Sequence, residues 1–148
     1  MKRVTLIGMN NPLHRDKDMA LWPDPVGCTG WHLWKLASAR TGCTRQEYVD
    51  AFCRVNLLST RKWEPRLAEQ GWRELESWVL ANSDVVVLLG AAVRRAVLRD
   101  IPAPEIGFDG SLALLPHPSG LNRWYNGRVN RAMAEILMEE LYALATEP

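Results

Sequence analysis

The sequence has few cysteines, and their spacing excludes the sites that cysteine usually builds. Three occur among the 148 residues, Cys28, Cys43 and Cys53, and no pair has the C-x-x-C spacing of zinc or redox motifs. The odd number and wide separation also argue against a disulfide framework. We therefore expect reduced, packed thiols, no metal site and no cofactor, and we interpret His14 and His32 as surface and packing residues.

Excess charge of one sign is also lacking. The formal net charge is +1, which gives no footprint for tight non-specific binding to nucleic acid, although a local basic patch is compatible with it. Hydrophobic and charged residues make up 47% and 24% of the chain, ordinary values for a globular protein. Without repeats or low-complexity segments, residues 1–148 are predicted to form a single domain.

Long apolar runs are absent, since none approaches the ~18 residues of a membrane span. The first residues lead into a predicted strand without the pattern of a signal peptide. We therefore expect a cytoplasmic monomer with no membrane partner.

Four apolar segments, 3–7, 52–55, 84–89 and 111–115, are typical of buried strands. They alternate with helical segments, expected at about 31–39, 44–51, 65–81, 91–98 and 122–145, with Thr29 and Thr44 as N-caps. This alternation predicts an α/β fold, a three-layer α/β/α sandwich with a four-stranded parallel sheet. In the third and fifth helices the side chains expected to face the core are Leu67, Trp72, Leu75, Trp78, Val79, Val129, Met133, Ile136, Leu137 and Leu141.

Three polar side chains follow predicted strands: Asn10, Asn56 and His117. Because the carboxyl ends of parallel strands meet at one edge of a sheet, we expect the three to surround one cleft. His117 lies between two prolines on a stiff backbone, and the N–H groups of Ser119 and Gly120 then offer a place for an oxyanion or phosphate. Each loop alone is equally compatible with a plain turn.

Five segments, in this order, resemble motifs of the uracil-DNA glycosylase superfamily, and the resemblance covers most of the chain. They are Gly8-Met9-Asn10-Asn11-Pro12, similar to the Gly-x-Asn-Pro-Gly motif, Pro25-Val26-Gly27-Cys28-Thr29-Gly30, similar to the Pro-Phe-Val-Gly-x-Ser-Gly segment, Asn56 after a strand, the strand and turn 86–92, and His117-Pro118-Ser119.

The sequence departs from that family's pattern at several points. Asn11 is an extra asparagine before the proline of the first motif. Pro25 occupies the position of the aromatic side chain that stacks on the base, a role that Trp22 or Trp31 could take. Three cysteines cannot supply the four-cysteine iron–sulfur cluster of some branches. The chain is short for the family, and Leu121 is its one evident apolar wedge.

The resemblance implies a DNA glycosylase-like hydrolase that cleaves the N-glycosidic bond of uracil or a related damaged or deaminated base. His117 would donate a hydrogen bond to the developing charge on the pyrimidine O2, and Asn10 would position the water. Asn56 would pair with the Watson–Crick edge of the flipped base. Beyond these, the residues expected to contact substrate are Gly8, Met9, Pro25, Val26, Trp31, Ser119, Gly120, Leu121, Asn122 and Arg123.

Two other functions fit the same residues. The pocket could be a non-catalytic base- or nucleotide-binding module, its water-placing loop disabled by the additional Asn11. It could also belong to an enzyme acting on modified bases or free nucleotides. The expected partner is accordingly single- or double-stranded DNA, or a nucleotide or nucleobase ligand.

Overall fold

A computed structural model describes residues 1–11 and 16–148, so the prediction for His14 lies outside the described residues. Five strands are present in this part of the chain: β1 (Val4–Asn10), β2 (Cys53–Leu58), β3 (Val85–Leu89), β4 (Gly107–Phe108) and β5 (Leu112–Leu115). The α-helices are α1 (Thr29–Thr41), α2 (Arg45–Ala51), α3 (Pro65–Asn82), α4 (Ala91–Leu98) and α5 (Arg128–Thr146). Short 3-10 turns, η1 (Lys17–Met19) and η2 (Arg123–Asn126), complete the fold.

The strands form one sheet in the order β2-β1-β3-β5-β4. The four predicted strands are parallel, but β4 pairs antiparallel with β5, so the sheet is mixed and five-stranded rather than four-stranded and parallel. Two residues are too few to show a strand period in the sequence. The Asp109 carboxylate closes the turn from β4 to β5 by accepting the N–H groups of Ser111 and Leu112 at 2.9 and 2.7 Å.

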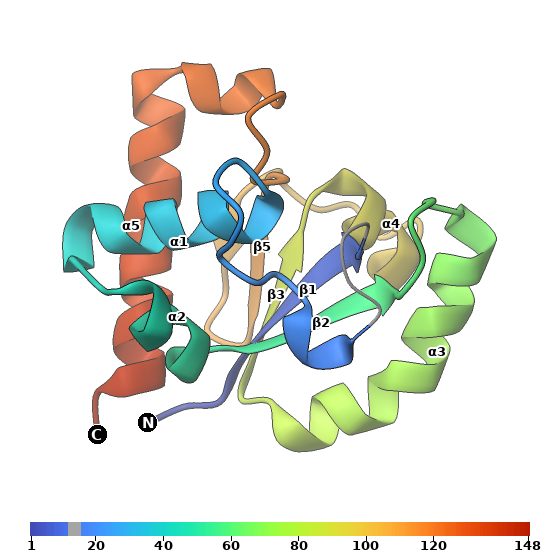
Figure 1. The fold of residues 1–148 in the computed structure, drawn as a ribbon. Coiled ribbons are helices and arrows are strands. Elements are labelled where there is room, and N and C mark those ends of the chain that lie inside the picture. The colour runs from blue at the N-terminus through green and yellow to red at the C-terminus, as the bar shows by residue number, and fades with distance from the viewer. Residues whose placement is uncertain (12–15) are drawn as a thin grey trace.

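Helices cover both faces of the sheet (Figure 1). On one face α1, α2 and α5 contribute Leu33, Tyr48 and Met138 to a core that includes Val87. On the other, α3 and α4 bury Val79 and Val93 against residues such as Ile7 and Leu88. The central strand β3 is buried along its whole length, as a parallel strand between two helical layers must be.

Several element boundaries differ from the predicted ones. The ladder between β1 and β2 continues through the pairs Gly8–Asn56 and Asn10–Leu58, so Asn10 and Asn56 are strand residues rather than loop residues. Thr29 is the first residue of α1, and the thiol of Cys28 caps the helix by accepting the N–H of Trp31 at 3.4 Å. The predicted capping box at Thr44 is confirmed.

The core-facing side of two helices was predicted only in part. In α3 Val79 is buried and Trp72 and Leu75 are partly buried, whereas Leu67 and Trp78 are exposed. The sheet-facing stripe of α5 is Ala134, Leu137, Met138, Leu141 and Ala145. Val129, Met133 and Ile136 lie outside this stripe and are exposed. The alanines of this stripe allow the helix to approach the sheet closely. The prediction missed them because it relied on large apolar residues.

Across the described residues, no helix combines the length and the apolar character that crossing a bilayer requires.

Candidate functional site

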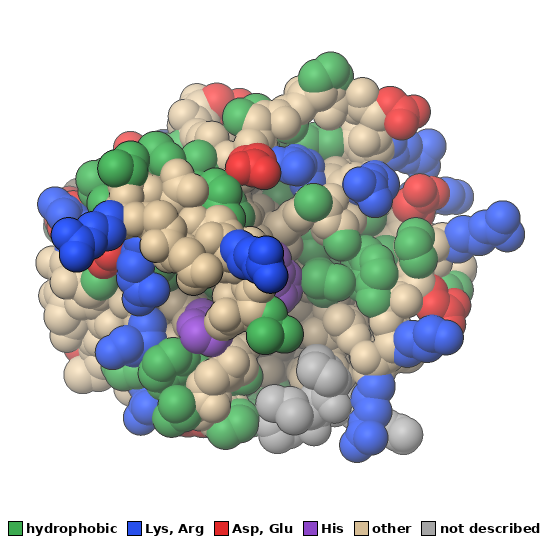
Figure 2. All heavy atoms as spheres, turned by 90° about the horizontal axis from the view of Figure 1, so that it is seen from above, with side chains coloured by type: hydrophobic (Ala, Val, Ile, Leu, Met, Phe, Trp, Pro, Cys, Tyr) green, Lys and Arg blue, Asp and Glu red, His purple; other side chains and the backbone are tan. Residues whose placement is uncertain are grey.

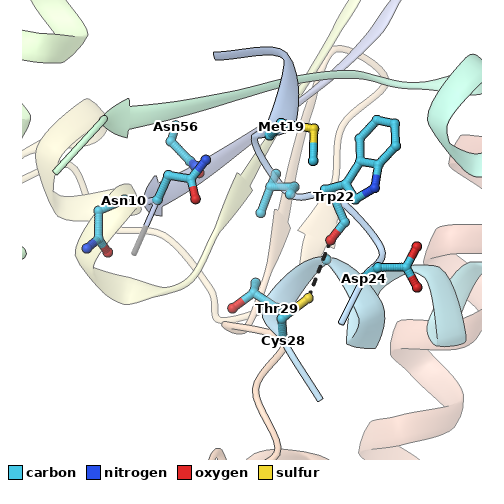
Figure 3. A pocket seen from close by; sticks show the side chains of 10 residues that line it. Asn10, Met19, Trp22, Asp24, Cys28, Thr29 and Asn56 are labelled. Carbon is cyan, nitrogen blue, oxygen red and sulfur yellow. Dashed lines mark hydrogen bonds between the residues drawn. The ribbon is translucent and has the colours of Figure 1, made fainter. Parts of the chain in front are cut away.

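A small hollow at the carboxyl ends of β1 and β2 holds two of the three predicted residues. We call it the amide pocket; its volume is about 70 Å³ and it is lined by Asn10, Asn11, Met19, Leu21, Trp22, Asp24, Cys28, Thr29, Gly30 and Asn56. Figure 3 shows Asn10 and Asn56, from neighbouring strands, on one side and Trp22 and Asp24 on the other.

The carbonyl oxygen of Asn56 is the most unusual atom in this pocket. Asn56 lies opposite Gly8 in the ladder, and a Cβ on Gly8 would overlap its Oδ1. That oxygen is buried and accepts no hydrogen bond from any described group. A buried acceptor without a donor costs about 1–3 kcal/mol.

Asn10 has a different environment. Its amide nitrogen donates to the carbonyl oxygens of Thr60 and Arg61, at 3.0 and 2.7 Å, and so ties the end of β1 to the loop after β2. With both N–H groups committed, the amide orientation is fixed, and Oδ1 is its remaining hydrogen-bonding atom. An oriented acceptor at this position can hold a water molecule.

The segment 19–30 forms the opposite wall and is held rigidly. Arg54 of β2 donates to the Ala20 carbonyl at 2.7 Å, and its guanidinium lies 5.2 Å from the Trp22 ring centroid. The Tyr48 hydroxyl donates to the Leu21 carbonyl at 2.9 Å. Gly30 is needed here because a Cβ would overlap the carbonyl groups of residues 21 and 22.

His117 lies in a neighbouring hollow of about 380 Å³, which we call the histidine hollow. Its other lining residues are Met9, Gly90, Ala91, Ala92, Arg94, Glu105, Pro116, Asn122 and Trp124. The backbone on either side of the imidazole is anchored: Asn122 donates to the His117 carbonyl at 3.0 Å and the Tyr125 hydroxyl to the Pro116 carbonyl at 2.6 Å. Gly90 passes so close that a Cβ would lie 2.8 Å from the Cβ of His117.

The His117 imidazole is held neutral at pH 7. Burial lowers its pKa below the usual 6.5, and the nearby His32 adds to the effect by charge repulsion. Burial and the charge of Arg131 lower the pKa of His32 in turn, while the Gly27 carbonyl opposes them. A neutral imidazole still donates one N–H, so His117 can serve as a hydrogen-bond donor.

The two hollows open on the same edge of the sheet. Met9 lines the histidine hollow and the next residue, Asn10, lines the amide pocket. The structure thus brings Asn10 and Asn56 into one pocket and His117 into the adjoining one, rather than all three around a single cleft. Figure 2 shows this edge from above, with histidine side chains near its middle and Lys and Arg side chains around its rim.

The other predicted contact residues divide into two groups. Ser119 and Gly120 line a third hollow with His32, and Asn122 lines both this hollow and the histidine hollow. Leu121, 93% exposed, and Arg123, also exposed, project into solvent beside them.

Pro25, Val26 and Trp31 are not among the described residues that line the amide pocket. Pro25 and Val26 are exposed. Trp31 packs edge-on against His32, with 4.9 Å between ring centroids. Trp22 is the aromatic side chain among the described residues that line the pocket. Met19, Leu21 and Cys28, which complete the wall, carry no sequence signal for a binding site.

No group of three or more His, Cys, Asp or Glu side chains within residues 1–11 and 16–148 is arranged to hold a metal ion. Comparison of the chain with models of known protein families and with curated proteins gives no match.

Proposed function

We propose that this chain is a DNA glycosylase-like hydrolase that cleaves the N-glycosidic bond of uracil or a related deaminated base. The observation that carries the proposal is the buried, unpaired Oδ1 of Asn56 in a pocket shared with Asn10. The resemblance of the sequence to the uracil-DNA glycosylase superfamily supports the same reading of both residues.

The Watson–Crick edge of uracil is complementary to the side-chain amide of Asn56. Uracil N3–H would donate to Oδ1, and the amide N–H would donate to uracil O4. A hollow of about 70 Å³ accommodates the edge of a base rather than a nucleotide. The sugar and the scissile bond would then lie outside it, over Met9 and Asn10 and toward His117.

Cleavage breaks the bond between C1′ and N1, and the electron pair leaves with the base. Negative charge develops on O2, where a neutral imidazole N–H of His117 would stabilise it. The sugar becomes oxocarbenium-like, and a water held by Asn10 Oδ1 adds to C1′. The proton that this water loses passes through solvent to the departed base anion, which completes the hydrolysis. One such donor is worth about 10²–10³ in rate.

A general base is not part of the proposed mechanism. Among the described residues lining the amide pocket, Asp24 is the only carboxylate. It is exposed and pairs with the guanidinium of Arg45 at 3.4 Å, so we assign it no part in activating the water. The reaction would therefore depend on positioning and electrostatic stabilisation.

A second candidate is a nucleobase-binding module without catalysis. The commitment of both Asn10 N–H groups to the loop carbonyls of Thr60 and Arg61 favours it, because the same bonds that orient Oδ1 also suit a purely structural asparagine. In that case Asn56 would bind the base and Asn10 would only close the sheet edge.

The deciding experiment is a cleavage assay on oligonucleotides that carry uracil, hypoxanthine or xanthine, both single- and double-stranded. We expect an abasic site at uracil, loss of the activity in Asn56→Ala, and unchanged activity in Asn82→Ala, a surface asparagine bonded to Trp78 on α3. Uracil-specific binding without cleavage would establish the module instead. If the protein neither binds nor cleaves any of these bases, both candidates are refuted.

A further inference from the structure

The third hollow at this edge of the sheet has its own polar character. It lies between α1, the loop after β5 and the start of α5, and its volume is about 90 Å³. Its lining residues are His32, Leu36, Pro118, Ser119, Gly120, Asn122, Tyr125, Asn126 and Arg131. We call it the polar hollow.

Two basic side chains converge on the polar hollow, the Arg131 guanidinium and the His32 imidazole, whose pKa is lowered by burial and by Arg131. His32 and Arg131 enter it from two different helices, and its described lining residues include no carboxylate. The Arg131 guanidinium lies 3.8 Å from the carboxylate of Glu135, one turn further along α5, in a partly exposed ion pair of low strength. His32 is also close enough to His117 for its charge to lower the pKa of that imidazole.

Two further donors in the loop after β5 remain available. Ser119 Oγ accepts the N–H of Leu121 at 3.2 Å, which leaves its hydroxyl proton free to donate. The N–H of Gly120 bonds to no other described group. A Cβ on Gly120 would lie 3.2 Å from His32 Nε2, so glycine lets this backbone and the imidazole approach the same small space.

Two of the other polar side chains of the polar hollow, Asn122 and Tyr125, are already committed. Asn122 donates to the His117 carbonyl and accepts the N–H of Trp124 at 3.1 Å, and the Tyr125 hydroxyl donates to Pro116. These bonds hold the loop in place and leave His32, Arg131, Ser119, Gly120 and Asn126 as the groups that can meet a ligand. The Arg131 guanidinium, the Ser119 hydroxyl and the Gly120 N–H are donors that match a tetrahedral oxyanion, and His32 becomes a further donor when it takes up a proton beside the bound anion.

We propose that the polar hollow binds a phosphate group, held by His32, Arg131, the Ser119 hydroxyl and the Gly120 N–H. The origin of this phosphate is inferred from the proposed function, because the polar hollow shares Asn122 with the histidine hollow. The phosphate would belong to the nucleotide whose base enters the amide pocket, as a monoester of a free nucleotide or a diester of a strand.

The test follows the imidazole resonances of His32 by NMR during titration with inorganic phosphate, and no cleavage is required. A bound phosphate stabilises imidazolium, so we expect the His32 pKa to rise. Arg131→Gln should weaken the apparent affinity about 10-fold, the effect of losing one charge-assisted hydrogen bond. Arg128→Gln, an exposed arginine on the same helix that does not line the polar hollow, is the matched control and should titrate like wild type.

Two further probes identify the source of the phosphate. Deoxyuridine monophosphate and a short single-stranded uracil oligonucleotide are each compared with deoxyuridine, which has no phosphate. If the monophosphate binds more tightly than the oligonucleotide, the phosphate belongs to a free nucleotide. If the oligonucleotide binds more tightly than the monophosphate, the phosphate belongs to a strand. In either case Arg131→Gln should remove most of the advantage over deoxyuridine.

An unchanged His32 resonance with all three phosphate probes would overturn the inference, as would equal affinity in wild type and Arg131→Gln. The outcome is separable from the proposed function. If Asn56 does not bind the base, Asn56→Ala will leave uracil selectivity unaltered, whereas the response of His32 to inorganic phosphate does not depend on Asn56.

Discussion

Asn56 shows how a single side chain depends on a neighbouring strand. The absence of a Cβ at Gly8 creates the space that its Oδ1 occupies, and Leu21 closes the same space, with its Cδ2 2.8 Å from where that Cβ would stand. The carbonyl oxygen is buried by these neighbours and bonded by none of the described ones. Base recognition is therefore assigned to an atom whose hydrogen-bonding capacity the folded chain leaves unused.

Asn56→Asp should exchange one base preference for another. An ionised carboxylate offers two acceptors, which repel uracil O4 and accept from the cytosine amino group. We expect loss of uracil processing and a small gain with cytosine, limited by the cost of placing a charge in a partly buried pocket. Parallel assays on matched uracil and cytosine single strands measure both effects. Equal uracil cleavage by wild type and variant would mean that Asn56 does not contact the base.

The turn between β3 and α4 positions His117 through a glycine. Gly90 has φ +92°, and a Cβ there would lie 2.8 Å from that of His117. Gly90→Ala should destabilise the fold by about 1–3 kcal/mol and displace the imidazole, with a loss of cleavage. Gly110→Ala is the matched control, because Gly110 has φ +102° but open space around it. Denaturant unfolding should show a loss of stability in both variants, whereas single-turnover assays should show a defect only in Gly90→Ala. Equal cleavage activity in the two variants would argue against a role for the contact between Gly90 and His117.

The loop after β5 presents Leu121 almost fully to solvent. An apolar side chain beside a base-binding site can fill the gap left in a duplex when a base leaves the stack. Leu121→Ala should lower cleavage of double-stranded substrate about 10-fold and leave cleavage of single-stranded substrate within about twofold of the wild-type rate. Only the duplex requires a wedge, because only there does the flipped base leave a gap in a stack. Ile101→Ala, another exposed apolar change, serves as control. An equal loss on both substrates would remove the wedge role.

At the level of elements, the apolar period identified four strands and the helices between them. It could not identify β4, which has two residues. On the inward side of α5 it identified Leu137 and Leu141 but not the alanines beside them. The polar Asn56 suggested a strand end, yet the β1–β2 ladder continues past it to Leu58. A polar residue such as Asn56 can be recognised as part of a strand only once the residue that it pairs with, here Gly8, is known.

For the molecule as a whole, parallel topology puts Asn10, Asn56 and His117 at one edge of the sheet, but the single cleft expected around them is divided between the amide pocket and the histidine hollow. Most of the wall formed by residues 19–30 was not predicted. That segment has no period, and its place depends on Arg54 and Tyr48, which hold it from β2 and α2. The polar hollow was missed because His32 and Arg131 are 99 positions apart and meet only in the fold.

The two histidines should make stability depend on pH. Both have pKa values below 6.5 in the folded protein, so the unfolded chain binds their protons more readily. Stability from this source is complete above pH 6.5 and is lost as pH falls below it. We expect His117→Gln to reduce the difference in unfolding free energy between pH 7 and pH 5, measured by urea denaturation. The same difference in both proteins would contradict burial of a neutral imidazole.

The central claim, that this sheet edge cleaves a glycosidic bond with His117 as donor, is tested most directly by single-turnover cleavage of a uracil-containing single strand. We predict that His117→Ala lowers the rate about 10²-fold or more, because the lost hydrogen bond strengthens chiefly in the transition state. Substrate affinity, measured on the same proteins, should change far less. A rate equal to that of the wild type would contradict the account.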